Sequence, residues 1–227
     1  AARCGAGHVL ARVGQGVGIF DIPKIDGHCH VLDPARFAYG PDIAYHPAGQ
    51  EIGTADYFHH VLDAYGVQHA LLVGPNSGYG TDNRCMLDAI ARGAGRFKGI
   101  AVLPHDTNQD ELRRLQDAGI VGAAFNVALH GTDYYADIAP LLQRLATLGM
   151  WAQIQVTKDQ LPALLPMMRD SGVQVLIDHC GRPDLRDGPD SPGQRALEEL
   201  AADGKSVIKF FVLQNTTYQN PAGWLSM

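Results

Sequence analysis

Two histidines separated by one residue are the clearest chemical feature of this 227-residue chain. The segment KIDGHCHV at 24–31 places His28 and His30 after a short apolar run. Side chains two positions apart on a strand lie on the same face, so both imidazoles can converge on one metal ion or one substrate. Such a pair also arises by chance, and alone it is compatible with a purely structural role.

A third histidine has a similar position later in the chain. The apolar run 173–177 is followed by Asp178 and His179, and then by the loop-forming sequence GRPD at 181–184. A β-branched run that ends at Gly and Pro predicts a buried strand followed by a loop. We therefore expect His28, His30 and His179 to form one site. Because neighbours on a strand point to opposite faces, we expect Asp178 to point away from His179 and to make a structural hydrogen bond.

The rest of the chain predicts the elements that must position these residues. Short β-branched runs alternate with longer amphipathic runs, which is the pattern of a parallel sheet built from strand–helix units. The predicted strands are 24–31, 67–73, 98–103, 120–126, 151–156, 173–178 and 206–212. The predicted helices are 54–65, 81–93, 108–118, 135–148, 159–170 and 192–203. The lack of a Ser/Gly-rich linker favours a single β/α barrel over a two-domain protein. An open doubly wound sheet is the alternative, but no glycine-rich phosphate loop follows the first strand.

In a β/α barrel the active site lies at the carboxyl ends of the strands. The three histidines fall at such ends, and several polar residues near the same ends are expected to bind substrate. These residues are Asn76, Ser77, Asn126, His130 and Gln155, and Tyr45 and Arg182 are further candidates for contact with a lactone substrate. Arg182 is equally suited to clamping a substrate carboxylate and to bracing its own loop, and both roles stay open.

Composition limits the class of partner. The chain is 46% apolar and carries a formal net charge of −6, which disfavours nucleic acid. No apolar run is long enough to cross a membrane, so we expect a small-molecule partner. Four widely spaced cysteines indicate a reducing compartment, and we expect a cytoplasmic protein. The length predicts one domain over 21–227, after a loose N-terminal arm over 1–20.

Five segments together resemble the amidohydrolase superfamily, in the branch that contains the 2-pyrone-4,6-dicarboxylate lactonases and sugar-lactone hydrolases. They are IDGHCHVLDP at 25–34, YGTDN at 79–83, KGIAVL at 98–103, AGIVGAAFN at 118–126 and VLIDHCGRPD at 175–184. The combination of DxHxH with DHxGRPD is specific, whereas HxH alone is weak. The resemblance implies a (β/α)8 TIM-like barrel that hydrolyses the ester of a lactone, with His28, His30 and His179 as catalytic residues around the carbonyl.

The resemblance leaves the cofactor open. In metal-dependent relatives these three histidines bind or neighbour a divalent ion, here expected to be Zn or Mn, that polarises the carbonyl and activates water. Without a metal, the same imidazoles can polarise the carbonyl as hydrogen-bond donors. The sequence does not decide between these two modes.

Two departures from the family pattern refine the expected function. Relatives that take a dicarboxylate present arginines in a GxRFN motif, where this chain has Ala124 before Phe125 and Asn126. Guanidinium groups are the natural clamps for carboxylates, so we expect a less anionic lactone.

The aspartate that serves relatives as general base after strand eight has no counterpart in this chain. The base is therefore unassigned, and we expect the eighth strand–helix unit to be missing.

The leading interpretation is an enzyme that opens a small carboxylated or sugar-derived lactone. A metal-dependent decarboxylase of the same superfamily and a catalytically impaired binding relic are the alternatives. A barrel of seven strands would expose two inner edges, which a second copy of the chain in a homo-oligomer could cover.

Overall fold

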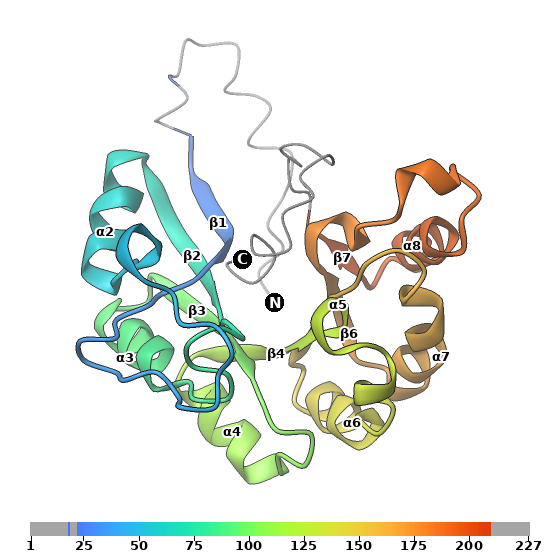
Figure 1. The fold of residues 1–227 in the computed structure, drawn as a ribbon, viewed down its shortest axis with the longest axis horizontal. Coiled ribbons are helices and arrows are strands. Elements are labelled where there is room, and N and C mark those ends of the chain that lie inside the picture. The colour runs from blue at the N-terminus through green and yellow to red at the C-terminus, as the bar shows by residue number, and fades with distance from the viewer. Residues whose placement is uncertain (1–17, 19–21, 210–227) are drawn as a thin grey trace.

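Within the part of the chain that the structure describes, seven parallel strands form one sheet, each hydrogen-bonded to the next in sequence order. They are β1 (Lys24–Cys29), β2 (Val67–Val73), β3 (Phe97–Val102), β4 (Ile120–Asn126), β5 (Trp151–Gln155), β6 (Gln174–Ile177) and β7 (Val207–Ile208). The structure, a computed structural model, describes residue 18 and residues 22–209. The sheet curls into an arc whose two ends are β1 and β7 (Figure 1).

Helices cover the convex side of this arc (Figure 1). They are α2 (Ala55–Ala64), α3 (Arg84–Arg92), α4 (Gln109–Asp117), α6 (Ala139–Thr147), α7 (Leu161–Ser171) and α8 (Pro192–Ala202), and a single-turn helix, α5 (Val127–His130), follows β4 directly. The side chains of Thr54, Asn108 and Ser191 cap α2, α4 and α8 by accepting backbone N–H groups in the first turn. Short 3-10 turns cover Gly49–Glu51, Asp133–Tyr135, Asp178–Gly181 and Leu185–Asp187. Within the described ranges no helix has the length and apolarity that crossing a bilayer requires.

The hydrophobic core lies between the sheet and this helical layer. Strand residues such as Leu72 and Ile154 are buried, and so are the helix residues Leu112, Leu141 and Leu145 that face them. Burying apolar area stabilises the fold by roughly 25 cal/mol per Å². The carboxyl edge of the sheet is thereby held rigidly, and the residues that follow each strand are fixed relative to one another.

The predicted alternation of strands and helices is confirmed for the described residues, and most boundaries agree within two or three residues. The helix predicted over 135–148 begins only at Ala139, because Pro140 fits the first turn of a helix and not its interior. The strand predicted over 173–178 already ends at Ile177. The N-terminal arm, apart from residue 18, and the predicted strand residues 210–212 lie outside the described residues.

A candidate active site at the carboxyl ends of the strands

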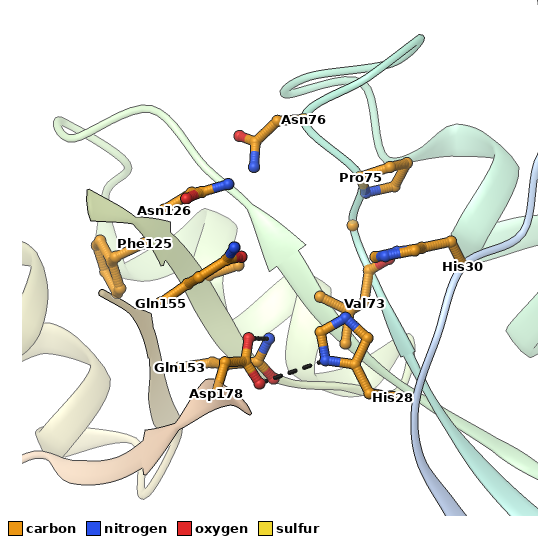
Figure 2. A pocket seen from close by; sticks show the side chains of 12 residues that line it. His28, His30, Val73, Pro75, Asn76, Phe125, Asn126, Gln153, Gln155 and Asp178 are labelled. Atoms are coloured by element: carbon orange, nitrogen blue, oxygen red, sulfur yellow. Dashed lines mark hydrogen bonds and ion pairs between the residues drawn. The ribbon is translucent and has the colours of Figure 1, made fainter. Parts of the chain in front are cut away.

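A pocket opens at the carboxyl edge of the curled sheet (Figure 2). Its lining residues come from the ends of β1, β2, β4, β5 and β6: His28, His30, Val73, Gly74, Pro75, Asn76, Ala124, Phe125, Asn126, Gln153, Gln155 and Asp178. Figure 2 shows the two histidines on one side, facing the side chains of Gln153 and Gln155 on the other. Among the described residues, four carboxamides and no arginine or lysine belong to this lining. The described lining is therefore polar without being cationic.

The structure brings the three predicted histidines together. The ring of His28 lies 5.0 Å from the ring of His30, nearly perpendicular to it, and 5.0 Å from the ring of His179. His28 and His30 both line the pocket, as their spacing on a strand predicts. His179 is buried beside His28 and is not part of the pocket lining. The three imidazoles thus form one cluster at the base of the site.

The protonation of His30 follows from its backbone contact. Nδ1 of His30 lies 2.8 Å from the carbonyl oxygen of Val73, and a carbonyl oxygen can only accept. Nδ1 therefore carries the proton, and in the neutral ring Nε2 holds a lone pair. Burial, reinforced by the neighbouring His28, lowers the pKa of His30 to about 4. At neutral pH the ring is uncharged and its Nε2 is a ligand or an acceptor, not a donor.

Asp178 is the centre of a buried polar network. Its carboxylate is 2% exposed and accepts a 2.6 Å hydrogen bond from Nε2 of Gln153. Its Oδ1 lies 3.1 Å from Nζ of Lys209 and 3.3 Å from Nδ1 of His28. Burial acts to raise the pKa of Asp178. The hydrogen bond and the charge of His28, together with the ammonium of Lys209, have the larger effect, so the pKa of Asp178 is lowered. The carboxylate is therefore kept ionised.

The expectation that Asp178 points away from His179 is wrong. Ligand atoms of His28, Asp178 and His179 all lie within 4.8 Å of one another. Strand β6 ends at Ile177, and the chain turns into a 3-10 turn at Asp178. The two-residue alternation that the prediction used applies only inside a strand.

The loop that carries His179 has an unusual backbone. His179, Cys180 and Arg182 have φ values of 51°, 53° and 42°, in the left-handed region that favours glycine. Each such residue costs on the order of 1–2 kcal/mol. The amide of Cys180 donates to the carbonyl of Lys209, and the amide of Lys158 donates to the carbonyl of Arg182. Strained backbone that its surroundings hold in place is typical of functional loops.

Three of the predicted substrate-binding residues line the pocket, namely Asn76, Asn126 and Gln155. Asn76 and Asn126 point toward one another across its upper part (Figure 2). Oδ1 of Asn126 accepts the amide of Leu129 at the start of α5, so its Nδ2 group is the one available to a ligand.

The other four predicted substrate-binding residues, Tyr45, Ser77, His130 and Arg182, do not line this pocket. The hydroxyl of Tyr45 donates to the carboxylate of Glu51. His130 is exposed at the end of α5, where its ring stacks on Tyr134 at 4.7 Å. Arg182 is half-buried in the strained loop. Contact of these four with a bound substrate stays a prediction.

Sequence reasoning missed Gln153 and Lys209. Gln153 precedes Gln155 by two residues on β5, and the spacing that paired His28 with His30 could have identified it. Lys209 follows the apolar pair of β7, and its amide donates to the carbonyl of Ile177. Only this pairing with β6 places the ammonium beside Asp178, and no local sequence signal reveals it.

The donor set fits a divalent metal ion. Imidazole nitrogens suit Zn and related metals, and the unprotonated Nε2 of His30 is a suitable ligand. The carboxylate of Asp178 already contacts the amide of Gln153, the ammonium of Lys209 and Nδ1 of His28. A second cation on the same carboxylate would be repelled, so Asp178 is better placed to orient His28 than to bind the metal.

Comparisons with known proteins agree with this geometry. A sequence profile described as amidohydrolase matches residues 25–222. The chain is 30% identical to a 2-pyrone-4,6-dicarboxylate hydrolase of Comamonas testosteroni, over 76% of this chain and 57% of the relative. It is also 30% identical to a 4-sulfomuconolactone hydrolase of Rhizobium radiobacter, over 80% of this chain and 62% of the relative. The chain therefore spans less than two thirds of the length of these curated relatives.

A similar fold is found in a crystal structure from Acinetobacter baumannii. That structure, described as a "probable 2-pyrone-4,6-dicarboxylic acid hydrolase" with citric acid bound, superposes with a TM-score of 0.70 at 31% identity. The match covers 82% of this chain and 68% of that one.

Proposed function

The chain belongs to the amidohydrolase family, and we propose that it hydrolyses the ester of a small organic lactone, carboxylated or sugar-derived. The observation that carries this proposal is the cluster of three imidazoles beside a pocket lined by four carboxamides. The similarity to hydrolases of 2-pyrone-4,6-dicarboxylate and of 4-sulfomuconolactone supports ester hydrolysis as the reaction class.

The curled sheet supports a (β/α)8 barrel as the complete architecture. β1 and β7 lie at the two ends of the arc, where a closed barrel would hold one further strand (Figure 1). The general base that family members carry after strand eight would belong to that unit, outside the described residues. His28, His30 and His179 act on the carbonyl in this proposal, and the residue that activates water is left unassigned.

The geometry favours metal-assisted polarisation over direct hydrogen bonding by His30. When bound, a divalent ion such as Zn or Mn would polarise the lactone carbonyl and lower the pKa of water. His28, His30 and His179 would hold it, while Asp178 and the carbonyl of Val73 orient the first two rings. His30 is a poor donor to a carbonyl, because its one proton is committed to Val73 and its low pKa prevents a second.

The pocket also indicates the substrate. Carboxamides offer both donors and acceptors, which suits the carbonyl, ring oxygen and hydroxyl groups of a lactone. The described lining includes none of the guanidinium groups that clamp dicarboxylates. We therefore propose a lactone with at most one carboxylate.

We infer a cytoplasmic location for the enzyme. The thiols of Cys29, Cys85 and Cys180 are all unpaired with one another, as a reducing compartment allows. Burial raises the pKa of Cys29, whose Sγ donates to the carbonyl of Leu71, so a packing role suits it better than a nucleophilic one.

A panel of lactones followed by pH-indicator release tests the proposed reaction. The protein is assayed after chelation and after loading with Zn or Mn. We expect ring opening of at least one lactone, lowered by about 100-fold or more in His28→Ala and in His179→Ala. His69→Ala, an exposed histidine at the opposite end of the sheet, is the matched control and keeps its activity. Ring opening that persists in both site variants would refute the proposal.

A further inference from the structure

Four side chains at the ends of β1, β5, β6 and β7 form a closed polar ring in the wall of the pocket. Nζ of Lys209 donates to Oε1 of Gln153 at 2.6 Å, and Nε2 of Gln153 donates to Oδ2 of Asp178 at 2.6 Å. Oδ1 of Asp178 contacts both Nζ of Lys209, at 3.1 Å, and Nδ1 of His28, at 3.3 Å. Lys209 therefore meets the site chiefly through Asp178 and His28, whereas Gln153 also lines the pocket itself.

Stability alone does not explain this ring. Gln153 and Asp178 are 1% and 2% exposed, and the side chain of Lys209 is 13% exposed. Removing a carboxylate and an ammonium from water costs desolvation free energy, and this cost is often larger than the free energy gained from their mutual attraction. Apolar residues of similar volume would fill the same space without that cost. A buried charged pair directly behind a site histidine points instead to a role in that site.

The pair acts on the proton of His28. Nδ1 of His28 lies 3.3 Å from the carboxylate of Asp178 and 3.4 Å from the ammonium of Lys209. A carboxylate accepts and an ammonium donates, so the two neighbours favour opposite tautomers of the ring. Asp178 favours a proton on Nδ1 and a lone pair on Nε2, and Lys209 favours the reverse.

Gln153 decides this competition. Its Oε1 and the Asp178 carboxylate take the two short hydrogen bonds of Lys209, at 2.6 and 3.1 Å. The contact of the ammonium with Nδ1 of His28, at 3.4 Å, is the longest of its three, which leaves Nδ1 better placed to donate to Asp178. The amide orientation of Gln153 is itself fixed, because a flipped amide would place NH₂ against the ammonium and an oxygen against the carboxylate.

We propose that Gln153 and Lys209 are positioning residues, which hold Asp178 so that His28 presents an unprotonated Nε2 to the pocket. The inference deepens the proposed lactone hydrolysis and rests on it only for the role of His28 in that site. An unprotonated Nε2 is what a metal ligand requires.

Nitrogen-15 NMR of histidine-labelled protein tests the proposal directly. Ring shifts distinguish the two tautomers, and His28→Ala identifies the signals of His28 by their loss. We expect the Nδ1–H tautomer of His28 in the wild type, because the carboxylate of Asp178 can only accept from Nδ1. In Gln153→Met, which keeps the volume but loses both bonds, we expect Lys209 to turn to Nδ1 and the ring to change to the Nε2–H tautomer.

The double variant Gln153→Met with Lys209→Met sharpens the test. Removal of the competing ammonium should return His28 to the Nδ1–H tautomer, which a purely structural role of Gln153 does not predict. Affinity for Zn, measured by competition with a chelator, should fall about 10- to 100-fold in Gln153→Met. It should stay unchanged in Lys98→Met, an exposed lysine on β3. If Gln153→Met does not fold, Gln153→Asn breaks the same bonds with a smaller change in polarity.

The outcomes separate this inference from the proposed function. An unchanged His28 tautomer and unchanged Zn affinity in folded Gln153→Met would overturn the positioning role, even if the wild type opens lactones. The predicted tautomer changes in a protein that opens no lactone would support the positioning role and count against the reaction.

Discussion

Replacing Asp178 with asparagine should destabilise the protein strongly. The new carboxamide would keep one acceptor for Nδ1 of His28, but its NH₂ group would then face Nε2 of Gln153, which now donates to Asp178 over 2.6 Å. If the amide of Gln153 flips to accept, its own NH₂ faces the ammonium of Lys209. One buried pair of facing donors is therefore unavoidable, and Lys209 also loses its counter-charge.

The structure sets the size of this effect. Removing one partner of a buried ion pair costs about 3–5 kcal/mol. The Lys209 side chain is 13% exposed and can turn partly to water, so we expect the low end, about 3 kcal/mol. For a chain of this length each kcal/mol lowers the melting temperature by about 2–4 °C, giving a loss of about 6–12 °C.

Urea unfolding at about pH 7 measures the difference in unfolding free energy between the wild type and Asp178→Asn. Asp117→Asn, at the exposed end of α4, is the control. The folded pKa of Asp178 is lowered, so its contribution is fully present above the ordinary carboxylate pKa and is lost as pH falls through the folded pKa. The difference in unfolding free energy between the wild type and Asp178→Asn should therefore become smaller as the pH is lowered below the ordinary carboxylate pKa. A loss below about 1 kcal/mol at neutral pH would refute the buried-pair reasoning.

Two further predictions concern stability. Burial is the main reason that the pKa values of His30 and His179 in the folded protein are lowered from 6.5 to about 4. Below about pH 6.5 the unfolded chain therefore binds protons at these two residues that the folded protein does not bind. Each histidine should therefore lower the free energy of unfolding by about 2 kcal/mol as the pH falls from about 6.5 to about 5. A free energy of unfolding, measured in urea, that stays constant over this pH range would contradict the two pKa shifts. Gly122→Ala should destabilise the fold by about 2–3 kcal/mol, because its Cβ would collide with the backbone carbonyl of Trp151 on the paired strand β5. Gly53→Ala, with only ordinary contacts around the new methyl group, is the control, and equal melting temperatures for the two variants would show that the close approach of β4 and β5 is misplaced.

Much of the fold could be predicted because its signals are local. Most strands of the sheet are short β-branched or apolar runs, such as β2 and β4. Helix starts such as that of α4 have a capping residue, here Asn108. The local sequence signals failed for elements that are shorter than one period of the pattern used to predict them. The single turn of α5 (Val127–His130) is too brief to show helical periodicity.

The site was predicted where spacing along one strand decides which side chains meet. His28 and His30 share a face because they are two residues apart, and the same rule places Gln153 with Gln155. Their meeting with His179 was predicted from the shared position at strand ends, but individual side-chain contacts between strands were not accessible in this way. Asp178 reaches His28 because the chain leaves β6 one residue earlier than predicted, and Lys209 reaches Asp178 only through the register of β7 on β6.

A crystal structure with a bound reaction product would test the central claim most directly. The ligand is the hydroxy acid formed from the lactone that the enzyme opens fastest. We predict that its new carboxylate lies against the rings of His28, His30 and His179, with the rest of the molecule between Asn76 and Asn126. Product bound elsewhere, for example in the groove beside His69 and Arg96 at the opposite end of the sheet, with the histidine cluster untouched, would contradict the account.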